Sequence, residues 1–322
     1  MNNDFLTSWG LSLMVFLPVA GAVLVLLLPK AEEQAVKVVA LVASLASAGV
    51  GLAVLVDFDY DHADKLQFVV DKSWIEVIGS RFLMGLDGLS VPLVALTLLV
   101  TPLVIIYSWN HFPEPHNPKA FLALILVLHT GMLGSFVAQD LILFFVFFEV
   151  VLLPMYFMIG VWGGEQRQYA SLKFFLYTMF GSALMLVSFI ALFILTKGNT
   201  DPNGSFAFSW FIAHGSGLAT NTAVWIFAGM FIGFAVKVPM FPFHTWLPDA
   251  HTQAPTQGSV ILAAILLKLG TYGFVRIALP FLPQAAVKWA PFIGALAVIG
   301  IIYGALGCLA QSDMKRLIAF SS

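Results

Sequence analysis

Long apolar runs alternate with short polar segments along this chain of 322 residues. Each run comes close to or exceeds the roughly 20 residues that a helix needs to cross a hydrocarbon layer about 30 Å thick. Backbone N–H and C=O groups find no water inside such a layer, so each run is expected to form a helix. The nine runs lie near residues 10–28, 35–56, 89–109, 119–138, 140–160, 169–196, 222–241, 256–279 and 286–308. The pattern predicts an all-α polytopic membrane protein, in which SDMKRLIAFSS at residues 312–322 starts a tenth helix.

The longest polar segment, near residues 57–88, contains two short runs with the composition of strands. They are LQFVV and SWIEVIG, and Asp71 and Lys72 separate them. Short β-rich runs on either side of polar residues are typical of a hairpin. We therefore expect a small hairpin on the membrane surface after the second helix. Further along, Asp140 precedes an apolar run and is expected to cap the helix that follows.

Composition excludes several classes of protein. Hydrophobic residues make up 60% of the chain and charged residues 10%, whereas a soluble domain carries about 25% charged residues. The net charge of −2 and the lack of a basic run argue against binding of nucleic acid. The single cysteine, Cys308, cannot build a disulfide framework or a cysteine-ligated cluster. The sequence contains neither a dinucleotide fingerprint nor a phosphate loop, so no cofactor is expected in this chain.

Three charged residues fall inside the apolar runs. Glu149 lies about 12 Å into its run and Lys237 about 20 Å into its own, at a rise of about 1.5 Å per residue. Lys268 lies near the centre of the next run. Charges in hydrocarbon are costly and are candidates for function. The alternative is a structural pair between Glu149 and one lysine, but it leaves the other lysine unexplained, and buried pairs are weak contributors to stability.

Two lysines and one carboxylate suit the handling of protons. Burial lowers the pKa of a lysine and a neighbouring carboxylate raises it, so a lysine under both influences can gain or release a proton when its partner moves. Lys237 is followed by Pro239, which removes a backbone donor and is expected to break the seventh helix. Broken helices at mid-membrane often form ion sites in transporters. An ordinary proline kink is the alternative.

The segment PFHTWLPDAHTQAPTQGS is the most polar stretch between two predicted spans. Its residues His244, Asp249 and His251 are candidates for a hydrated path that delivers protons. A metal site is the rival interpretation, although these three residues lack a familiar ligand spacing. Two further basic residues, Lys173 and Arg276, are weaker candidates for a supporting role, because both lie toward helix ends, where an anchoring role at the interface is the simpler expectation.

Several stretches together resemble one family. They are FLMGLDGLS, DLILFFVFFEVVLLPMYFMIGVWGG, KFFLYTMFGSALML, VKVPMFPFHTWLPDAHTQAPTQGSVILAAILLKLGTYGFVR and SDMKRLIAFSS. The chain is similar to the antiporter-like M-subunit family of respiratory complex I, the proton-translocating NADH:quinone oxidoreductase. Sister L-type and N-type subunits and multi-subunit sodium/proton antiporters share the prolines and lysines but differ around HTWLPDAHTQAPTQGSVILA.

The resemblance implies roles for the buried charges. In this family the glutamate of the fifth helix, here Glu149, pairs with the lysine of the broken seventh helix, here Lys237. The lysine of the eighth helix, here Lys268, passes the proton along a central hydrated axis. The family has two inverted five-helix repeats within fourteen helices, so this chain is expected to be truncated at its C-terminus. The implied division is residues 1–118 for the first three helices, 119–279 for the first repeat and 280–322 for the start of the second.

The resemblance also implies a function, partners and a location. The chain is expected to translocate protons in the membrane arm of complex I, beside L-type and N-type neighbours, in the bacterial cell membrane. NADH, flavin, iron–sulfur clusters and quinone are then expected in partner subunits. One alternative is a sodium/proton antiporter subunit, which predicts sodium transport without electron donors. Another is a non-conducting membrane scaffold, which predicts that Glu149→Gln harms assembly but spares turnover.

Overall fold

The computed structural model describes residues 4–29, 31–197 and 204–322. Within these ranges, nine helices are long and apolar enough to cross a membrane, which confirms the predicted polytopic helical fold. The chain divides into two units, residues 1–158 with 255–265 and residues 159–254 with 266–322, and each is described by itself.

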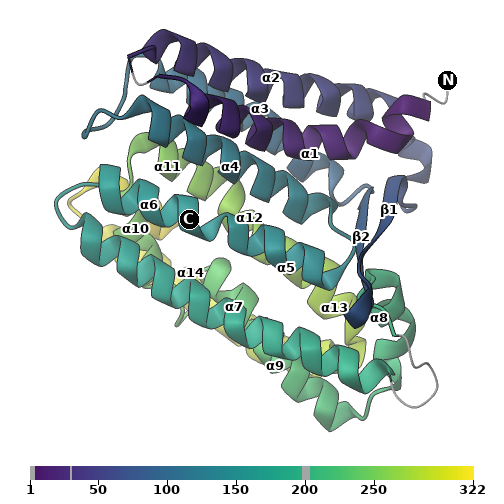
Figure 1. The fold of residues 1–322 in the computed structure, drawn as a ribbon. Coiled ribbons are helices and arrows are strands. Elements are labelled where there is room, and N and C mark those ends of the chain that lie inside the picture. The colour runs from purple at the N-terminus through teal and green to yellow at the C-terminus, as the bar shows by residue number, and fades with distance from the viewer. Residues whose placement is uncertain (1–3, 30, 198–203) are drawn as a thin grey trace. The chain divides into compact units, whose positions relative to one another are not determined.

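The first unit is a helical bundle with a hairpin at one end. Helix α4 lies along α1, α2 and α3 and is buried over most of its length (Figure 1). Helix α5 packs on α4, and α11 packs on α3. The elements are α1 (Asp4–Leu27), α2 (Glu33–Asp57), β1 (Gln67–Ile75), β2 (Ser80–Leu86), α3 (Val91–Ser108), α4 (Pro118–Val137), α5 (Leu141–Val150), most of α6 (Leu152–Trp162) and α11 (Thr256–Ile261).

The second unit is built around the long helix α7, which packs along α9 (Figure 1). Helix α9 also packs against α12 and α14, and α15 packs against α10 and α14. The elements are α7 (Arg167–Lys197), α8 (Phe208–His214), α9 (Thr220–Lys237), α10 (Trp246–Gln253), α12 (Leu267–Gly273), α13 (Leu279–Phe281), α14 (Pro283–Leu309) and α15 (Met314–Ser321). Helix α15 starts where the tenth helix was predicted.

The hairpin is confirmed, but the predicted positions of its strands are wrong. Asp71 and Lys72 lie inside β1, opposite Leu83 and Phe82 of β2, and do not form the turn. The chain reverses at Gly79, whose φ of 73° is a left-handed conformation that glycine adopts without steric cost. Both polar residues are exposed, so the strand tolerates them, and the Arg81 Nε donates to Asp71 Oδ1 at 2.6 Å.

Asp140 caps α5, as predicted, and also attaches the hairpin to this helix. Its Oδ1 accepts hydrogen bonds from the N–H groups of Ile142 (2.9 Å) and Leu143 (3.1 Å) and from the hydroxyl of Ser80 (3.0 Å). Its Oδ2 accepts from the N–H of Arg81 at 3.0 Å. Burial raises the pKa of Asp140, and the four hydrogen bonds oppose this shift only in part. One side chain therefore connects β2 to the start of the helix that carries Glu149.

We expect Asp140→Ala to lower the free energy of unfolding by about 2–4 kcal/mol, because a helix cap is lost and buried donors are left unsatisfied. Asp140→Asn is the matched control and should cost less, since its carbonyl oxygen can keep the bonds that Oδ1 accepts. Thermal unfolding of the detergent-solubilised variants measures both effects. Equal stability of the two variants would show that the hydrogen bonds accepted by Asp140 Oδ1 do not contribute to the free energy of unfolding.

Candidate functional site

Lys237 lies at the point where the seventh spanning helix breaks. Helix α9 ends at Lys237, shorter than the predicted run, because Pro239 has no N–H to donate. The N–H of Met240 donates to the carbonyl of Ala235 at 2.9 Å instead. The indole N–H of Trp246 donates to the carbonyl of Val236, also at 2.9 Å. The break is thus satisfied by a rearranged hydrogen-bond set, and the Lys237 side chain is only 4% exposed.

A glycine allows another helix to approach Lys237 closely. A Cβ atom at Gly270 of α12 would lie 2.9 Å from the backbone N of Val238 and 3.0 Å from the Cβ of Lys237. A side chain at position 270 would therefore displace the backbone next to Lys237. This contact places α12, which carries Lys268 two residues earlier, directly against the end of α9.

Lys268 lies in a spanning helix with irregular hydrogen bonding. Short π-helical segments, Leu262–Leu266 and Phe274–Ala278, flank α12 on both sides. Such segments occur often at functional sites. The Lys268 side chain is exposed at the surface of the described chain, in contrast to the buried Lys237. A charge at mid-span is costly against lipid, and the role of Lys268 in a proton path stays a prediction.

Glu149 lies near a second break. Helix α5 ends at Val150 and α6 starts at Leu152, because Pro154 cannot donate to the carbonyl of Val150. The side chain of Glu149 is partly buried. Glu149 belongs to the first unit, whereas Lys237 and Lys268 belong to the second. The pairing of Glu149 with Lys237 stays a prediction.

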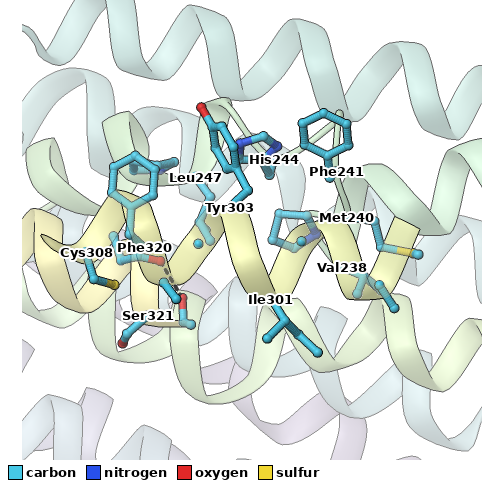
Figure 2. Close-up of a pocket in the computed structure, with 18 of the residues that line it drawn as sticks. Val238, Met240, Phe241, His244, Leu247, Ile301, Tyr303, Cys308, Phe320 and Ser321 are labelled. Atoms are coloured by element: carbon cyan, nitrogen blue, oxygen red, sulfur yellow. Dashed lines mark hydrogen bonds between the residues drawn. The ribbon is translucent and has the colours of Figure 1, made fainter. Parts of the chain in front are cut away.

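His244 borders a cavity of about 670 Å³ beside the break. Figure 2 shows its ring beside those of Phe241 and Tyr303, with ring centroids 5.6 Å and 5.1 Å away. Residues Val238–Phe241, Leu247 and Pro248 of α10, and helices α14 and α15 form the rest of the wall, which is largely apolar. Burial lowers the pKa of His244, and the charge of Lys173 lowers it further. His244 is therefore held neutral next to the broken helix.

The structure brings Lys173 and Asp249 together. Lys173 Nζ donates to Asp249 Oδ2 at 2.7 Å, and Arg316 Nη2 of α15 lies 3.8 Å from Asp249 Oδ1. Lys173 therefore has an ion-pair partner, and its anchoring role at the interface stays a prediction. Among the residues placed in the structure, no three His, Cys, Asp or Glu side chains converge in a way that could hold a metal ion.

Arg276 is not part of this group of charges. It lies in the π-helical segment Phe274–Ala278, where its Nε donates to the hydroxyl of Tyr272 at 3.2 Å and its guanidinium lies 5.5 Å from the centre of the same ring. These contacts hold the arginine against its own helix.

Three contributors to the site were missed by sequence reasoning. The indole of Trp246 donates to the backbone at the broken helix, a role that no pattern around this residue indicates. Lys315 and Arg316 dock α15 onto the polar loop, since Lys315 Nζ donates to the carbonyl of Ala254. The one signal for the last two was their adjacency in SDMKR, a basic pair directly before an apolar run.

His251 is buried beside Lys315. Burial, together with the smaller effect of the Lys315 charge, lowers its pKa from 6.5 to about 4. The unfolded chain therefore binds a proton at this ring below pH 6.5, whereas the folded protein does so only near pH 4. The stability that the neutral ring contributes is present above pH 6.5 and is lost as the pH falls toward 4.

Acid is therefore expected to destabilise the wild type more than a His251→Gln variant. Lowering the pH from 7 to 5 should cost the wild type roughly 2 kcal/mol more. Unfolding temperatures of both proteins at the two pH values test this expectation. An equal decrease of the unfolding temperature in both proteins would show that a group other than His251 causes the acid sensitivity.

Two family descriptions match the chain. Residues 138–322, more than half of it, match "NADH:quinone oxidoreductase/Mrp antiporter, TM". Residues 66–135 match "NADH-ubiquinone oxidoreductase chain 4, amino terminus".

Relatives and solved structures agree with these matches. "NADH-quinone oxidoreductase subunit M" of Rhodobacter capsulatus is 43% identical over 326 residues, covering 97% of this chain and 61% of the relative. "NADH-ubiquinone oxidoreductase chain 4" of Arabidopsis thaliana is 39% identical, covering 98% of this chain and 61% of the relative. The fold superposes on a chain of respiratory complex I from Thermus thermophilus with a TM-score of 0.82 and 29% identity, covering 96% of this chain and 61% of that one. A chain of the Mrp complex from Dietzia has a TM-score of 0.80 at 21% identity, covering 96% of this chain and 32% of that one, and shares the fold.

Proposed function

Because the chain belongs to the NADH:quinone oxidoreductase/Mrp antiporter family of membrane subunits, we propose that it translocates protons in the membrane arm of an NADH:quinone oxidoreductase. The chain spans 61% of the length of the Rhodobacter relative. Electron transfer from NADH to quinone takes place in partner subunits, and L-type and N-type subunits are its neighbours in the bacterial cell membrane.

The burial of Lys237 at a helix break carries this proposal. An amine that is 4% exposed inside a spanning segment is costly to keep charged. At the break beside it, Met240 and Trp246 replace the regular ladder, and such irregular backbone occurs at membrane depth where it is buried in protein or lines a water-filled cavity. A lysine in such a place gains or releases a proton when nearby charge changes, which is what a pump without its own redox centre requires.

The proposed mechanism couples the movement of charge along the membrane arm to the protonation of Lys237 and Lys268. Quinone reduction elsewhere shifts charge along the membrane, and this shift breaks or remakes the bond between Glu149 and Lys237. The proton affinity of Lys237 changes in consequence, and the proton moves to Lys268. The contact of Gly270 with Lys237 places the two lysine-bearing helices in van der Waals contact, whereas Lys268, two residues earlier, lies on another face of α12. Residues 119–279 form one five-helix repeat that contains all three groups.

Inverted membrane vesicles that contain the complex test the function. With NADH and quinone, we expect acidification of the vesicle lumen that an inhibitor of quinone reduction abolishes and that sodium does not change. Sodium movement without an electron donor would instead indicate an antiporter subunit. A scaffold predicts instead that Glu149→Gln lowers the amount of complex and leaves proton pumping per assembled complex unchanged.

A further inference from the structure

A cluster of three charges in the second unit is distinct from the buried lysines of the proposed pump. It consists of Lys173 on α7, Asp249 on α10 and Arg316 on α15. Each oxygen of the Asp249 carboxylate faces a different cation. Oδ2 accepts from Lys173 at 2.7 Å, whereas Oδ1 lies 3.8 Å from Arg316, which is too far for a direct hydrogen bond. One carboxylate thus has two cationic partners and makes a direct hydrogen bond to only one of them, Lys173.

Neither ion pair is expected to hold the Asp249 carboxylate strongly. Lys173, Asp249 and Arg316 are 19%, 24% and 49% exposed, so solvent screens both pairs. Ion pairs of this kind contribute little to stability. Exchange of the carboxylate from Lys173 to Arg316 therefore meets a small thermodynamic barrier, as a switch requires.

Space and polar groups for the exchange are present. A cavity of about 40 Å³ lies between Asp249 and Arg316, with Gln166, Tyr169, Thr252 and Gln253 in its wall. A water molecule needs at least about 10–15 Å³ and two to four polar partners. Both conditions are met here, so the gap between Asp249 and Arg316 can be bridged or closed.

The cluster is connected to Lys237 through hydrogen bonds. Helix α10 carries both Asp249 and Trp246, and the Trp246 indole holds the carbonyl of Val236, one residue before Lys237. The Tyr177 hydroxyl of α7 shares a hydrogen bond with the Thr245 hydroxyl at 2.8 Å, directly before α10. A movement of α10 between α7 and α15 would therefore displace the backbone of Val236 at the helix break.

We infer that Asp249 is a positioning residue for proton transfer at Lys237, and that it works by exchanging its ion pair between Lys173 and Arg316. This inference rests on the proposed function and adds a second charge switch to it. With Asp249 on Lys173, α10 is held toward α7. With Asp249 on Arg316, α10 is held toward α15 and the bond from Trp246 to Val236 shifts with it.

Removal of the second partner is the first test. Arg316→Leu leaves the Lys173–Asp249 pair in place, and half of the arginine side chain is exposed, so the protein should fold. We expect NADH-driven proton pumping per assembled complex to fall about fivefold or more, the lower range of a coupling between two sites. Lys288→Leu, which removes an exposed cation from α14, is the control and should pump normally.

Charge exchange separates a switch from a structural clamp. In the double variant Lys173→Asp/Asp249→Lys, the first pair is restored with reversed sign, but Arg316 now repels the lysine at position 249. A clamp predicts normal pumping in this variant, whereas a switch predicts assembly with pumping as low as in Arg316→Leu. Adding Arg316→Glu restores both pairs and should recover pumping.

The outcomes distinguish this inference from the proposed function. Normal pumping in Arg316→Leu, or in the double variant, would contradict the exchange of the Asp249 ion pair and would leave the proposed function untouched. If the double variant does not assemble, Arg316→Leu decides by itself. The Lys237→Ala variant, measured in the same membranes, tests the proposed function separately. If pumping is lost in Lys237→Ala but normal in Arg316→Leu, the proposed function stands and the role of Asp249 is contradicted.

Discussion

Replacement of Lys237 by alanine is expected to abolish most NADH-driven proton pumping while the complex still assembles. The amine belongs to a residue that is only 4% exposed at the helix break, and alanine at this position can neither bind nor release a proton. Proton transfer groups commonly contribute a hundredfold or more to rate, so we expect a decrease of roughly tenfold at the least. The measurement is acidification of inverted vesicles, normalised to the amount of assembled complex.

Two further substitutions identify the cause of that loss. Lys237→Arg keeps a positive charge but cannot be deprotonated, so it should pump as poorly as Lys237→Ala if proton release matters. Lys197→Ala, at the end of α7, removes a lysine remote from the break and should pump normally. Pumping at the wild-type rate in Lys237→Arg would mean that the charge alone, and not its titration, is needed.

Glu149→Gln is the second substitution with a large expected effect. Glutamine has nearly the shape of glutamate, so the packing of α5 should survive, but it carries no charge with which to hold a protonated lysine. Proton affinity at Lys237 would then no longer follow the state of a partner. We expect pumping to fall roughly tenfold or more, with normal amounts of complex in the membrane.

The scaffold alternative predicts the opposite result for Glu149→Gln. If Glu149 only locks helices together, the variant should assemble poorly, and each complex that does form should turn over normally. The amount of complex, measured on native gels, and the pumping rate per complex therefore distinguish the two interpretations. Glu165→Gln, in the exposed loop before α7, serves as the control.

The spans could be predicted from sequence because hydrocarbon imposes one rule on every backbone group. Hydropathy along the chain is sufficient to place nine helices, and Pro239 is sufficient to break the seventh. The hairpin shows where this reasoning ends. Its existence follows from composition, but its register depends on Gly79 and on the cross-strand pair between Asp71 and Arg81.

The candidate site could be predicted only one residue at a time. A charge inside an apolar run is visible in the sequence, so Glu149, Lys237 and Lys268 could be selected. The bond between Lys173 and Asp249 joins residues 76 positions apart, and no local pattern indicates it. The π-helical segments around Lys268 have the same apolar composition as a regular helix, so hydropathy cannot reveal them.

The most direct test of the central claim is a double-mutant cycle on Glu149 and Lys237, read out as protons pumped per assembled complex. Two residues that act as one unit in proton transfer are strongly non-additive. We predict that Glu149→Gln/Lys237→Ala pumps no worse than Lys237→Ala alone. If the two losses instead multiply, the carboxylate and the amine act independently, and a switched pair at the broken helix does not drive the pump.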